Sequence, residues 1–340
     1  MKYLRVKIST CQLYKISVFF LFIFIFNNLA KAQDYPVVKA RNGDGIYSLL
    51  KRNGLSPGKY LDDFIKLNKS KLGKNNSLFA GRDYKLPIAA QITVGEGIAY
   101  DIFGEKYKYV KKVDNQLNGA IYYLISGHGG PDPGAIGHLG KRTLCEDEYA
   151  YDVTLRLAHC LMEHGATVYM IIRDDNDGIR DDSFLSSDKD EKCYPDLDIP
   201  RSQLARLRQR KDAVNKLYLA NKGKFQRLLI VHVDSRSKSE NIDVFFYHDE
   251  RSRSGEKMAD ILQHTFRKKY DYYQPNRGYN GSVSTRNLFI LKYSYPTAVF
   301  TEIGNINHKR DQKRLIVPGN RQALAEWLAE GMITDFKTNK

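Results

Sequence analysis

The stretch "LISGHGGPDPGAIG" (residues 124–137) decides the fold of the larger part of the chain. It continues the apolar run "GAIYYLIS" (119–126), whose length and composition are typical of a buried strand. Glycine in a turn costs backbone entropy, so the closely spaced glycines around His128 indicate either a sharp turn or the close approach of another group. We therefore predict a buried strand whose carboxyl end opens into a tight loop that carries His128.

From residue 119 onward, apolar runs alternate with amphipathic segments, which is the pattern of an α/β domain whose sheet is covered by helices on both faces. The predicted strands are "GAIYYLIS" (119–126), "ATVYMIIR" (166–173), "RLLIVHVDS" (227–235), "NIDVFFYH" (241–248), "RNLFILKY" (286–293) and "TAVFTEIG" (297–304). The predicted helices lie at about 147–164, 202–221, 254–268 and 320–333. Ser202 and Ser254 are suitable N-cap residues for two of them.

Residues 1–32 have the order of a secretory signal peptide: basic residues, the apolar run "ISVFFLFIFIF" (16–26), and small residues ending at Ala32. Eleven apolar residues are too few for a membrane span, which needs about 20. No cysteine follows Ala32, so a lipid anchor is not indicated either. We expect an exported protein, periplasmic or extracellular, without a stable membrane anchor after cleavage.

The chain is strongly basic. Residues 1–32 contain five basic residues and no acidic residue, so their removal lowers the net charge from +15 to +10. For an exported protein this charge favours an anionic cell-envelope polymer, and not nucleic acid, as the partner. The remaining length of about 308 residues indicates two domains, because single cores rarely exceed about 250–300 residues.

Residues 35–88 predict a small α+β unit of strand, helix, helix and strand. The unit resembles a LysM domain, a glycan-binding module: Gly43-Asp44 matches the first turn, Leu67-Asn68 the second helix, and 81–87 the last strand. Gly45-Ile46 departs from the usual Thr-Leu. The resemblance implies binding of chains that contain N-acetylglucosamine, and the alternative is a small packing module. Residues 89–118 predict a connecting β segment without recognisable chemistry.

The acidic segment 173–200 interrupts the alternation. Its aspartates suggest a calcium loop of the EF-hand type. With Gly178 as the loop glycine, however, the first ligand position falls on Arg173, which cannot coordinate a cation. We therefore interpret 173–200 as a solvated insertion that could form a lid over the active site.

Three candidate residues follow predicted strands. His128 lies beyond the first strand, while His232 and Glu302 end the runs "LLIVH" and "AVFTE". Ligands of open α/β sheets bind beyond the carboxyl ends of the strands. Two imidazoles and a carboxylate at that edge suit zinc, which takes three protein ligands in catalytic sites. Glu146, at the start of the next helix, is a fourth candidate, although an acid there also complements the helix dipole.

The ordered motifs "GHGGPDPGAIG", "HGATV", "IVHVDS" and "TEIGN" resemble those of zinc-dependent N-acetylmuramoyl-L-alanine amidases from about residue 120 to 333, and the predicted catalytic domain is 119–335. The resemblance implies an α/β domain with a mixed sheet, a Zn²⁺ ion held by His128, Glu146 and His232, and Glu302 as the catalytic carboxylate. It implies hydrolysis of the amide bond between N-acetylmuramic acid and L-alanine in peptidoglycan, with a zinc-bound water as the nucleophile and Glu302 as general base and acid.

The register of the motifs prefers Glu146 to Glu148 as the ligand, without excluding Glu148. This sequence departs from the family at Ser126, where Asp or Asn is usual, and at "HVD" (232–234), where His-Ala-Asn is usual. Both departures could alter hydrogen bonds that orient the imidazoles. Arg210 and Asn215 match a motif that looks structural, and we expect Asp132 to anchor the glycine loop.

The other histidines and the cysteines have simpler interpretations. His159, His164 and His264 fall on predicted helices and are interpreted as surface or core groups, whereas His138, His248 and His308 lie nearer the predicted site. Cys145, Cys160 and Cys193 follow the leader, and this odd number does not describe a disulfide framework, although a Cys145–Cys193 bond stays open.

Two other functions remain open at this point. One is a non-catalytic peptidoglycan-binding protein with a degenerate amidase fold. The other is a different zinc hydrolase of envelope glycans or peptides, such as a deacetylase or a carboxypeptidase. The presence of all four of His128, Glu146, His232 and Glu302 argues against the first alternative.

Overall fold

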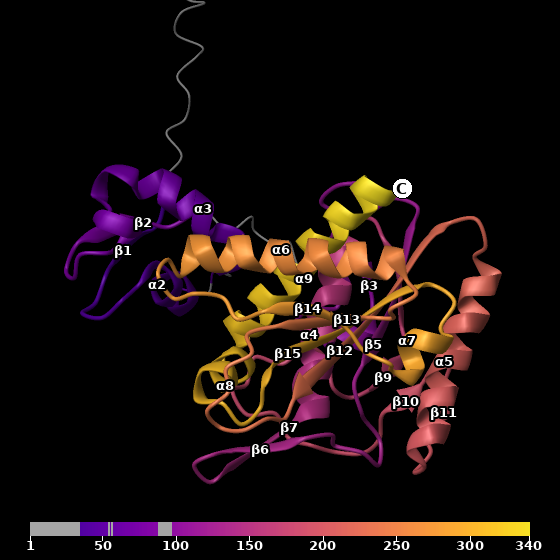
Figure 1. Ribbon diagram of the computed structural model, residues 1–340. Helices are drawn as coiled ribbons and strands as arrows, with labels where there is room; N and C mark the ends of the chain where they lie inside the picture. The colour runs from indigo at the N-terminus through magenta and orange to yellow at the C-terminus, as the bar shows by residue number, and fades with distance from the viewer. Residues whose placement is uncertain (1–34, 54, 56, 88–96) are drawn as a thin grey trace, which may run out of the picture.

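The computed structural model describes residues 35–53, 55, 57–87 and 97–340 (Figure 1). The predicted signal peptide and part of the predicted connecting segment lie outside these residues. The described chain forms a small N-terminal unit and a larger α/β domain.

The N-terminal unit has the predicted order of strand, helix, helix and strand. Its elements are β1 (Val37–Lys39), α2 (Ile46–Arg52), α3 (Pro57–Asn68), two short 3₁₀ turns η2 (Lys69–Lys71) and η3 (Lys74–Asn76), and β2 (Asp83–Lys85). Strands β1 and β2 pair antiparallel. Leu49, Leu50 and Phe64 are fully buried against Tyr84, so the two helices and the strand pair share one small core.

Residues 97–118 connect the two parts. They contain β3 (Ile98–Ala99), the 3₁₀ turn η4 (Asp101–Phe103) and β4 (Tyr109–Val110). Strands β3 and β4 form an antiparallel pair. The described part of the predicted connecting β segment is therefore a small hairpin.

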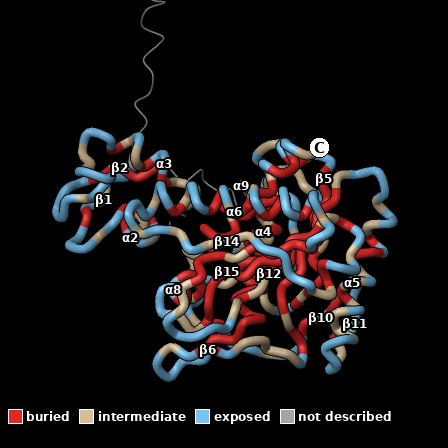
Figure 2. The backbone as a smooth tube through the Cα atoms, in the orientation of Figure 1, coloured by how far each residue is buried: buried red, intermediate tan, exposed pale blue. Residues whose placement is uncertain are grey.

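A six-stranded mixed sheet forms the centre of the larger domain. Its strands lie in the order β14 (Ser282–Thr285), β13 (Phe245–His248), β15 (Thr297–Asn305), β12 (Phe225–Asp234), β5 (Ala120–Ser126) and β8 (Thr167–Met170). All neighbouring strands are parallel except β13 and β15. The central strands are buried along nearly their whole length (Figure 2), which explains why they read as continuous apolar runs.

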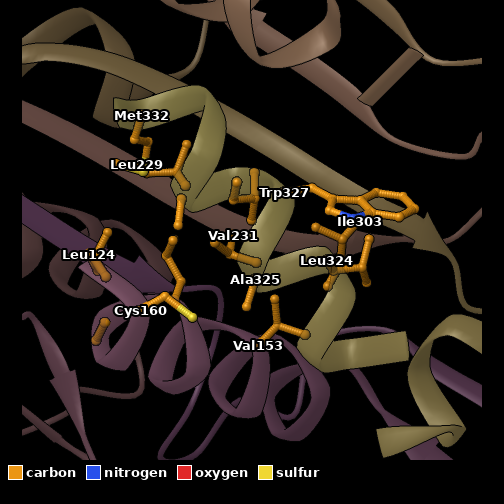
Figure 3. Close-up of a cluster of buried hydrophobic side chains, with 14 of the residues drawn as sticks. Leu124, Val153, Cys160, Leu229, Val231, Ile303, Leu324, Ala325, Trp327 and Met332 are labelled. Atoms are coloured by element: carbon orange, nitrogen blue, oxygen red, sulfur yellow. The ribbon is translucent and has the colours of Figure 1, made fainter. Parts of the chain in front are cut away.

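Helices cover both faces of the sheet, as predicted. Leu229 and Val231 of β12 face α4 (Glu146–Glu163), α6 (Arg253–Tyr273) and α9 (Pro318–Asn339) in the larger core (Figure 3). Leu228 and Ile230 face α5 (Gln203–Ala220) and α7 (Phe289–Tyr293) in the smaller core on the opposite face. Helix α8 (Lys309–Ile316) packs beside β15 and α9. The fold is thus α/β, with a mixed sheet between two helical layers.

Several predicted elements were wrong or misplaced. The run "RNLFILKY" was predicted as a strand, but it contains the short helix α7, which buries Ile290 and Leu291 in the smaller core. A short apolar run does not distinguish these two structures. Helix α6 begins after Ser252, whose side chain accepts a hydrogen bond from Gly255 N, so Ser254 is not the N-cap. Ser202 is the N-cap of α5, as predicted.

The acidic segment 173–200 is largely exposed to solvent, as predicted, but parts of it are structured and anchored. It contains β10 (Lys192–Cys193) and β11 (Leu197–Asp198), which form a three-stranded antiparallel sheet with β9 (Ile172–Arg173). The carbonyls of Arg180 and Asp182 accept hydrogen bonds from Arg321 Nη2, at 2.8 and 2.9 Å, and Arg321 is fully buried. Composition does not reveal this anchoring, because main-chain carbonyls of the segment bind a buried partner from α9.

Two further features complete the fold. The hairpin of β6 (Ile136–Leu139) and β7 (Arg142–Cys145) leads into α4. Cys145, Cys160 and Cys193 are all buried free thiols, so the described chain contains no Cys145–Cys193 bond. Within the described residues, no helix has the length and hydropathy of a membrane span.

Candidate metal centre

The four predicted site residues lie at one edge of the sheet. His128 follows β5, His232 is near the end of β12, and Glu302 lies on β15 directly opposite His232 in the parallel ladder. Glu146 is the first residue of α4. Because β12 lies between β5 and β15, the carboxyl ends of three neighbouring strands bring these side chains to one place.

The two imidazoles face the Glu146 carboxylate from two sides. His128 Nε2 lies 3.2 Å from Glu146 Oε2, and His232 Nδ1 lies 2.7 Å from Glu146 Oε1. The two rings approach edge to face, with their centroids 4.9 Å apart. One ligand atom from each of the three residues therefore falls within 4.8 Å of the other two.

Backbone groups fix the Glu146 carboxylate. Ala135 N donates to Oε2 at 2.8 Å, and Val233 N donates to Oε1 at 3.0 Å. Glu146 is only 4% exposed. Burial raises its pKa, but the hydrogen bonds and positive charges of both histidines outweigh burial and hold the pKa well below its usual range. The carboxylate is thus ionised and oriented toward the imidazoles.

The glycine loop is shaped by two close approaches. A Cβ atom at Gly127 would lie 2.4 Å from Cε1 and Nδ1 of His232. A Cβ atom at Gly134, whose φ is +68°, would lie 2.7 Å from His128 Cδ2 and 2.8 Å from Glu146 Oε2. The glycines at these two positions leave the space that the imidazoles and the carboxylate occupy.

Groups outside the triad orient His128. Asp132 Oδ2 lies 2.9 Å from His128 Nδ1 and 2.6 Å from Arg206 Nη2. Arg210 donates to the carbonyl of His128. Burial lowers the pKa of His128, but Asp132 and Glu146 outweigh it and raise the pKa to about 9. A carboxylate that accepts from one ring nitrogen of a histidine fixes the ring and makes the other nitrogen a stronger ligand, and Asp132 is placed to do this for His128.

Glu302 is a buried carboxyl group with spare hydrogen-bonding capacity. It is 6% exposed, and no partner in the described part of the chain reaches its Oε2 atom. Burial, together with the charges of Glu146 and Asp234, raises its pKa well above the usual range. Arg286 Nη1, 3.8 Å from Glu302 Oε1, acts in the opposite direction.

All four residues line one cavity of about 300 Å³. Sequence reasoning missed Phe300, which stacks on His232 with ring centroids 4.4 Å apart, and Arg286. Phe300 was open to prediction, because residues i and i+2 of a strand share a face and Glu302 was already a candidate. Arg286 was not, because it follows the short strand β14, which the sequence did not reveal.

Other candidates lie outside this cavity. Glu148 pairs with Arg180 at 2.9 Å, so the structure brings Glu146, and not Glu148, to the histidines. None of the remaining histidines, all of which are described, lines the cavity. No residue of 173–200 lines it either, although this segment is described in full, so a lid from this segment is not present here.

The donor set fits zinc. Bonds of about 2.1 Å in a tetrahedral site separate the ligand atoms by roughly 3.4 Å. The imidazole nitrogens lie 3.2 and 2.7 Å from the Glu146 oxygens, so a shift of under about 1 Å brings the three groups to that spacing. Two nitrogens and one oxygen leave a fourth position, as catalytic zinc sites do. The unpartnered Oε2 of Glu302 in the same cavity supplies a buried acceptor for a group bound there.

Comparison with known proteins agrees with this geometry. Residues 123–334 match the family described as N-acetylmuramoyl-L-alanine amidase. The chain belongs to the N-acetylmuramoyl-L-alanine amidase family. The match begins in β5 and ends in α9, so it includes all four residues of the candidate centre and the whole mixed sheet except Ala120–Tyr122.

Individual relatives are more distant. The chain is 26% identical over 223 residues to the probable cell wall amidase LytH of Staphylococcus aureus, covering 65% of this chain and 60% of that protein. Among solved structures, the amidase AmiC2 of Nostoc punctiforme is 19% identical, with a TM-score of 0.47 and coverage of 65% of this chain and 98% of that chain. The amidase Ami1 of Mycobacterium smegmatis is 16% identical, with a TM-score of 0.48 and coverage of 66% and 99%.

The two positions at which this chain departs from the usual motifs of the amidase family lie close to the candidate metal centre. Ser126 is buried, and its Oγ has no hydrogen-bond partner among the described residues. Asp234 lines the cavity and accepts a hydrogen bond from Arg236 Nε at 2.5 Å. Asn215, by contrast, bridges Tyr293 O and Tyr295 N, which agrees with the structural role suggested for it.

Proposed function

We propose that this protein is an exported, zinc-dependent N-acetylmuramoyl-L-alanine amidase that cleaves the amide bond between N-acetylmuramic acid and L-alanine in peptidoglycan. The observation that carries the proposal is the convergence of His128, Glu146, His232 and Glu302 in one cavity at the carboxyl edge of the sheet. Membership of the family supports the choice of bond.

In this proposal His128, Glu146 and His232 hold the zinc ion. Zinc supplies a Lewis acid that activates water and polarises the amide carbonyl. Asp132 keeps the His128 ring in place through its Nδ1 atom. The buried Glu146 carboxylate fixes the spacing of the two imidazoles.

Glu302 is proposed as the general base and acid. It takes a proton from the attacking water and delivers a proton to the departing nitrogen, so that the amide yields the carboxylate of muramic acid and the amine of L-alanine. Its raised pKa has the direction that this role requires, because a group that both accepts and returns a proton works best with a pKa near the working pH.

The cavity rim supports an anionic substrate. Arg286 is about half exposed beside Glu302, and its guanidinium is a suitable partner for a carboxylate of the stem peptide. The N-terminal unit is proposed to bind glycan strands as a LysM-like module. Its described strand, helix, helix and strand order is consistent with that proposal.

The test measures zinc content and the products released from purified sacculi by the wild type, by Glu302→Gln, and by the exposed control Glu250→Gln. We expect about one zinc ion per chain in all three. Stem peptides with a free L-alanine amine should appear with the wild type and the control, while Glu302→Gln should be slower by about 10²–10⁴-fold, the usual contribution of general acid–base catalysis.

Other outcomes would replace the proposal. Release of acetate instead of stem peptides would indicate a deacetylase. Sedimentation with sacculi without zinc and without any release would indicate a non-catalytic binding protein.

A further inference from the structure

A group of acidic side chains lies beside the glycine loop and outside the candidate metal centre. Asp147, Glu148 and Glu191 each place a carboxylate oxygen within 4.8 Å of the other two, and all three are buried. Glu191 also belongs to a second such group, with Asp188 and Asp190. We name these five residues the acidic cluster.

Positive charge around this cluster is scarce. Arg180 Nη1 lies 2.9 Å from Glu148 Oε2. Of the basic side chains that the structure describes, no other comes within ion-pair distance of the five carboxylates. Carboxylates crowded together in a buried place repel one another strongly unless a cation or protons neutralise them.

Two oxygens in the cluster have no hydrogen-bond partner. Asp147 is 2% exposed; its Oδ1 accepts from Glu148 N at 2.9 Å, but its Oδ2 meets no donor among the described residues. The same is true of the buried Oδ1 of Asp188. A buried, unpartnered carboxylate oxygen is costly, and it points to a bound ion or water at that place.

We propose that the acidic cluster binds a divalent cation, with Ca²⁺ as the ion that suits it best. All the available side-chain donors are carboxylate oxygens, which hard cations prefer. Softer metals prefer sulfur or imidazole ligands. Ca²⁺ takes six to eight oxygens in flexible geometry, whereas Mg²⁺ demands a near-ideal octahedron. The two triads, which share Glu191, provide carboxylate oxygens from two separate segments without octahedral regularity.

The cation would connect three parts of the molecule. Asp147 and Glu148 lie in the first turn of α4, next to Glu146. Asp188, Asp190 and Glu191 belong to the segment 173–200. Glu191 Oε2 accepts a hydrogen bond from Gly130 N at 2.5 Å, in the loop that carries His128. Bound Ca²⁺ would therefore fasten both the acidic segment and the glycine loop to α4.

This site differs from an EF-hand, which explains why sequence spacing excluded calcium. A contiguous calcium loop would require a ligand at Arg173. In the structure Arg173 pairs with Asp175 at 3.5 Å, and the buried ligands come instead from Asp147 and Glu148, about 40 residues earlier in the chain than Glu191. The proposed cation site does not depend on the amidase activity or on zinc.

The test titrates Ca²⁺ into the chelator-treated full chain by calorimetry and follows thermal unfolding with and without Ca²⁺. We expect about one ion per chain and an unfolding midpoint raised by several degrees. Asp147→Asn and Asp188→Asn should each weaken binding about tenfold or more, since each removes a negative charge and one of two carboxylate oxygens. Asp196→Asn, the same substitution at an exposed position of the same segment, should bind like the wild type.

Two further measurements separate lost Ca²⁺ binding from misfolding and from loss of zinc. In chelator, Asp147→Asn should unfold at the wild-type temperature or above it, because it relieves repulsion; lost binding then cannot be attributed to misfolding. His232→Ala should lose zinc but keep Ca²⁺, which separates the two centres. No binding by the wild type at about 10 mM Ca²⁺, above the weakest extracellular sites, would overturn the proposal. Equal binding by the wild type, Asp147→Asn and Asp188→Asn would also overturn it.

Discussion

At Gly127 the absence of a side chain decides where His232 can lie. An added methyl group would overlap the imidazole at 2.4 Å, and Gly127 is in turn held to β12 by its N–H, which donates to Val231 O at 2.7 Å. Neither the backbone nor the ring can move away without breaking the ladder or leaving Glu146.

We predict that Gly127→Ala folds but loses zinc affinity by about 10–100-fold, the usual cost of disturbing the groups that orient a ligand. Activity on sacculi should fall by about 10²-fold, as expected for a misplacement near 1 Å. Chelator competition measures the affinity. Gly45→Ala is the matched control, because nothing lies within 4 Å of its added Cβ. Wild-type zinc affinity in Gly127→Ala would contradict the geometry described.

Individual site residues could be predicted from the sequence where a histidine or a carboxylate stands at the end of an apolar strand. His128, His232 and Glu302 all follow apolar runs, so their common edge could be inferred from the order of residues alone. Their roles stay predictions until they are tested. Arg206 was missed because its partner, Asp132, is 74 residues away and no local pattern links them.

At the scale of elements, Asp152 joins α4 to α9 and to the acidic segment. It is fully buried and accepts from Arg156 Nε at 2.7 Å, from Arg321 Nε at 2.5 Å and from Arg180 N at 2.8 Å. Its removal would leave the buried Arg321 guanidinium without its carboxylate, and Arg156 with only Asp181, 3.3 Å from its Nη2.

Asp152→Ala should therefore lower the free energy of unfolding by about 3–5 kcal/mol, the range for breaking a buried ion pair from one side. Urea unfolding measures the change. Asp63→Ala removes an exposed partner of Lys66, 3.9 Å away, and should change stability by less than about 0.5 kcal/mol. Similar losses in both variants would show that burial of Asp152 does not matter.

Asp181 links the acidic segment to the connecting hairpin in a manner that depends on pH. Burial raises its pKa, but hydrogen bonds from Lys106 and Tyr107 and the charge of Arg156 outweigh burial and lower the pKa to about 2, from an ordinary value of 3.8. A carboxyl group with a lowered pKa stabilises the fold above its unfolded-state pKa and loses that contribution as pH falls through its folded-state pKa.

We therefore expect the wild type to be more stable than Asp181→Asn at neutral pH. The difference should shrink between about pH 4 and pH 2, as the wild-type carboxyl becomes protonated. Urea midpoints at several pH values measure it, with Asp196→Asn as the exposed control. A difference that stays constant down to about pH 2 would exclude this linkage.

Element prediction failed for two physical reasons. The run "RNLFILKY" is apolar without a clear period, so α7 could not be distinguished from a strand. The acidic segment was interpreted from its own residues alone, whereas Arg321 and Asp152, which hold it, lie in distant helices. Strands β5, β12 and β15 were predicted well because both of their faces are buried.

At the scale of the whole molecule, Tyr273 at the end of α6 packs against both the larger core and the core of the N-terminal unit. Its ring stacks on Trp327 at 5.8 Å and meets Tyr47 of the N-terminal unit edge to face at 5.7 Å. Tyr272 Oη adds a hydrogen bond to Asp62 Oδ1 at 3.2 Å. The two parts of the molecule are therefore joined through aromatic side chains.

We predict a single calorimetric unfolding transition for the wild type and two transitions for Tyr47→Ala, because the variant loses the aromatic contact that couples the N-terminal unit to the larger domain. Phe79→Ala, at a ring that is 47% exposed in the same unit, should keep one transition. Two transitions in the wild type would show that the units already unfold independently.

Strand β12 has a consequence for how long the centre survives. Its residues 227–231 are bonded to β5 on one side and to β15 on the other. Amides of a buried central strand are among the slowest to exchange, because freeing either ladder of the strand requires nearly the whole domain to open. His232 and Glu302 are attached to this slowest-exchanging core, so the centre and the sheet should be lost in the same event on heating. We expect no partly open state in which the fold persists and these two side chains have separated.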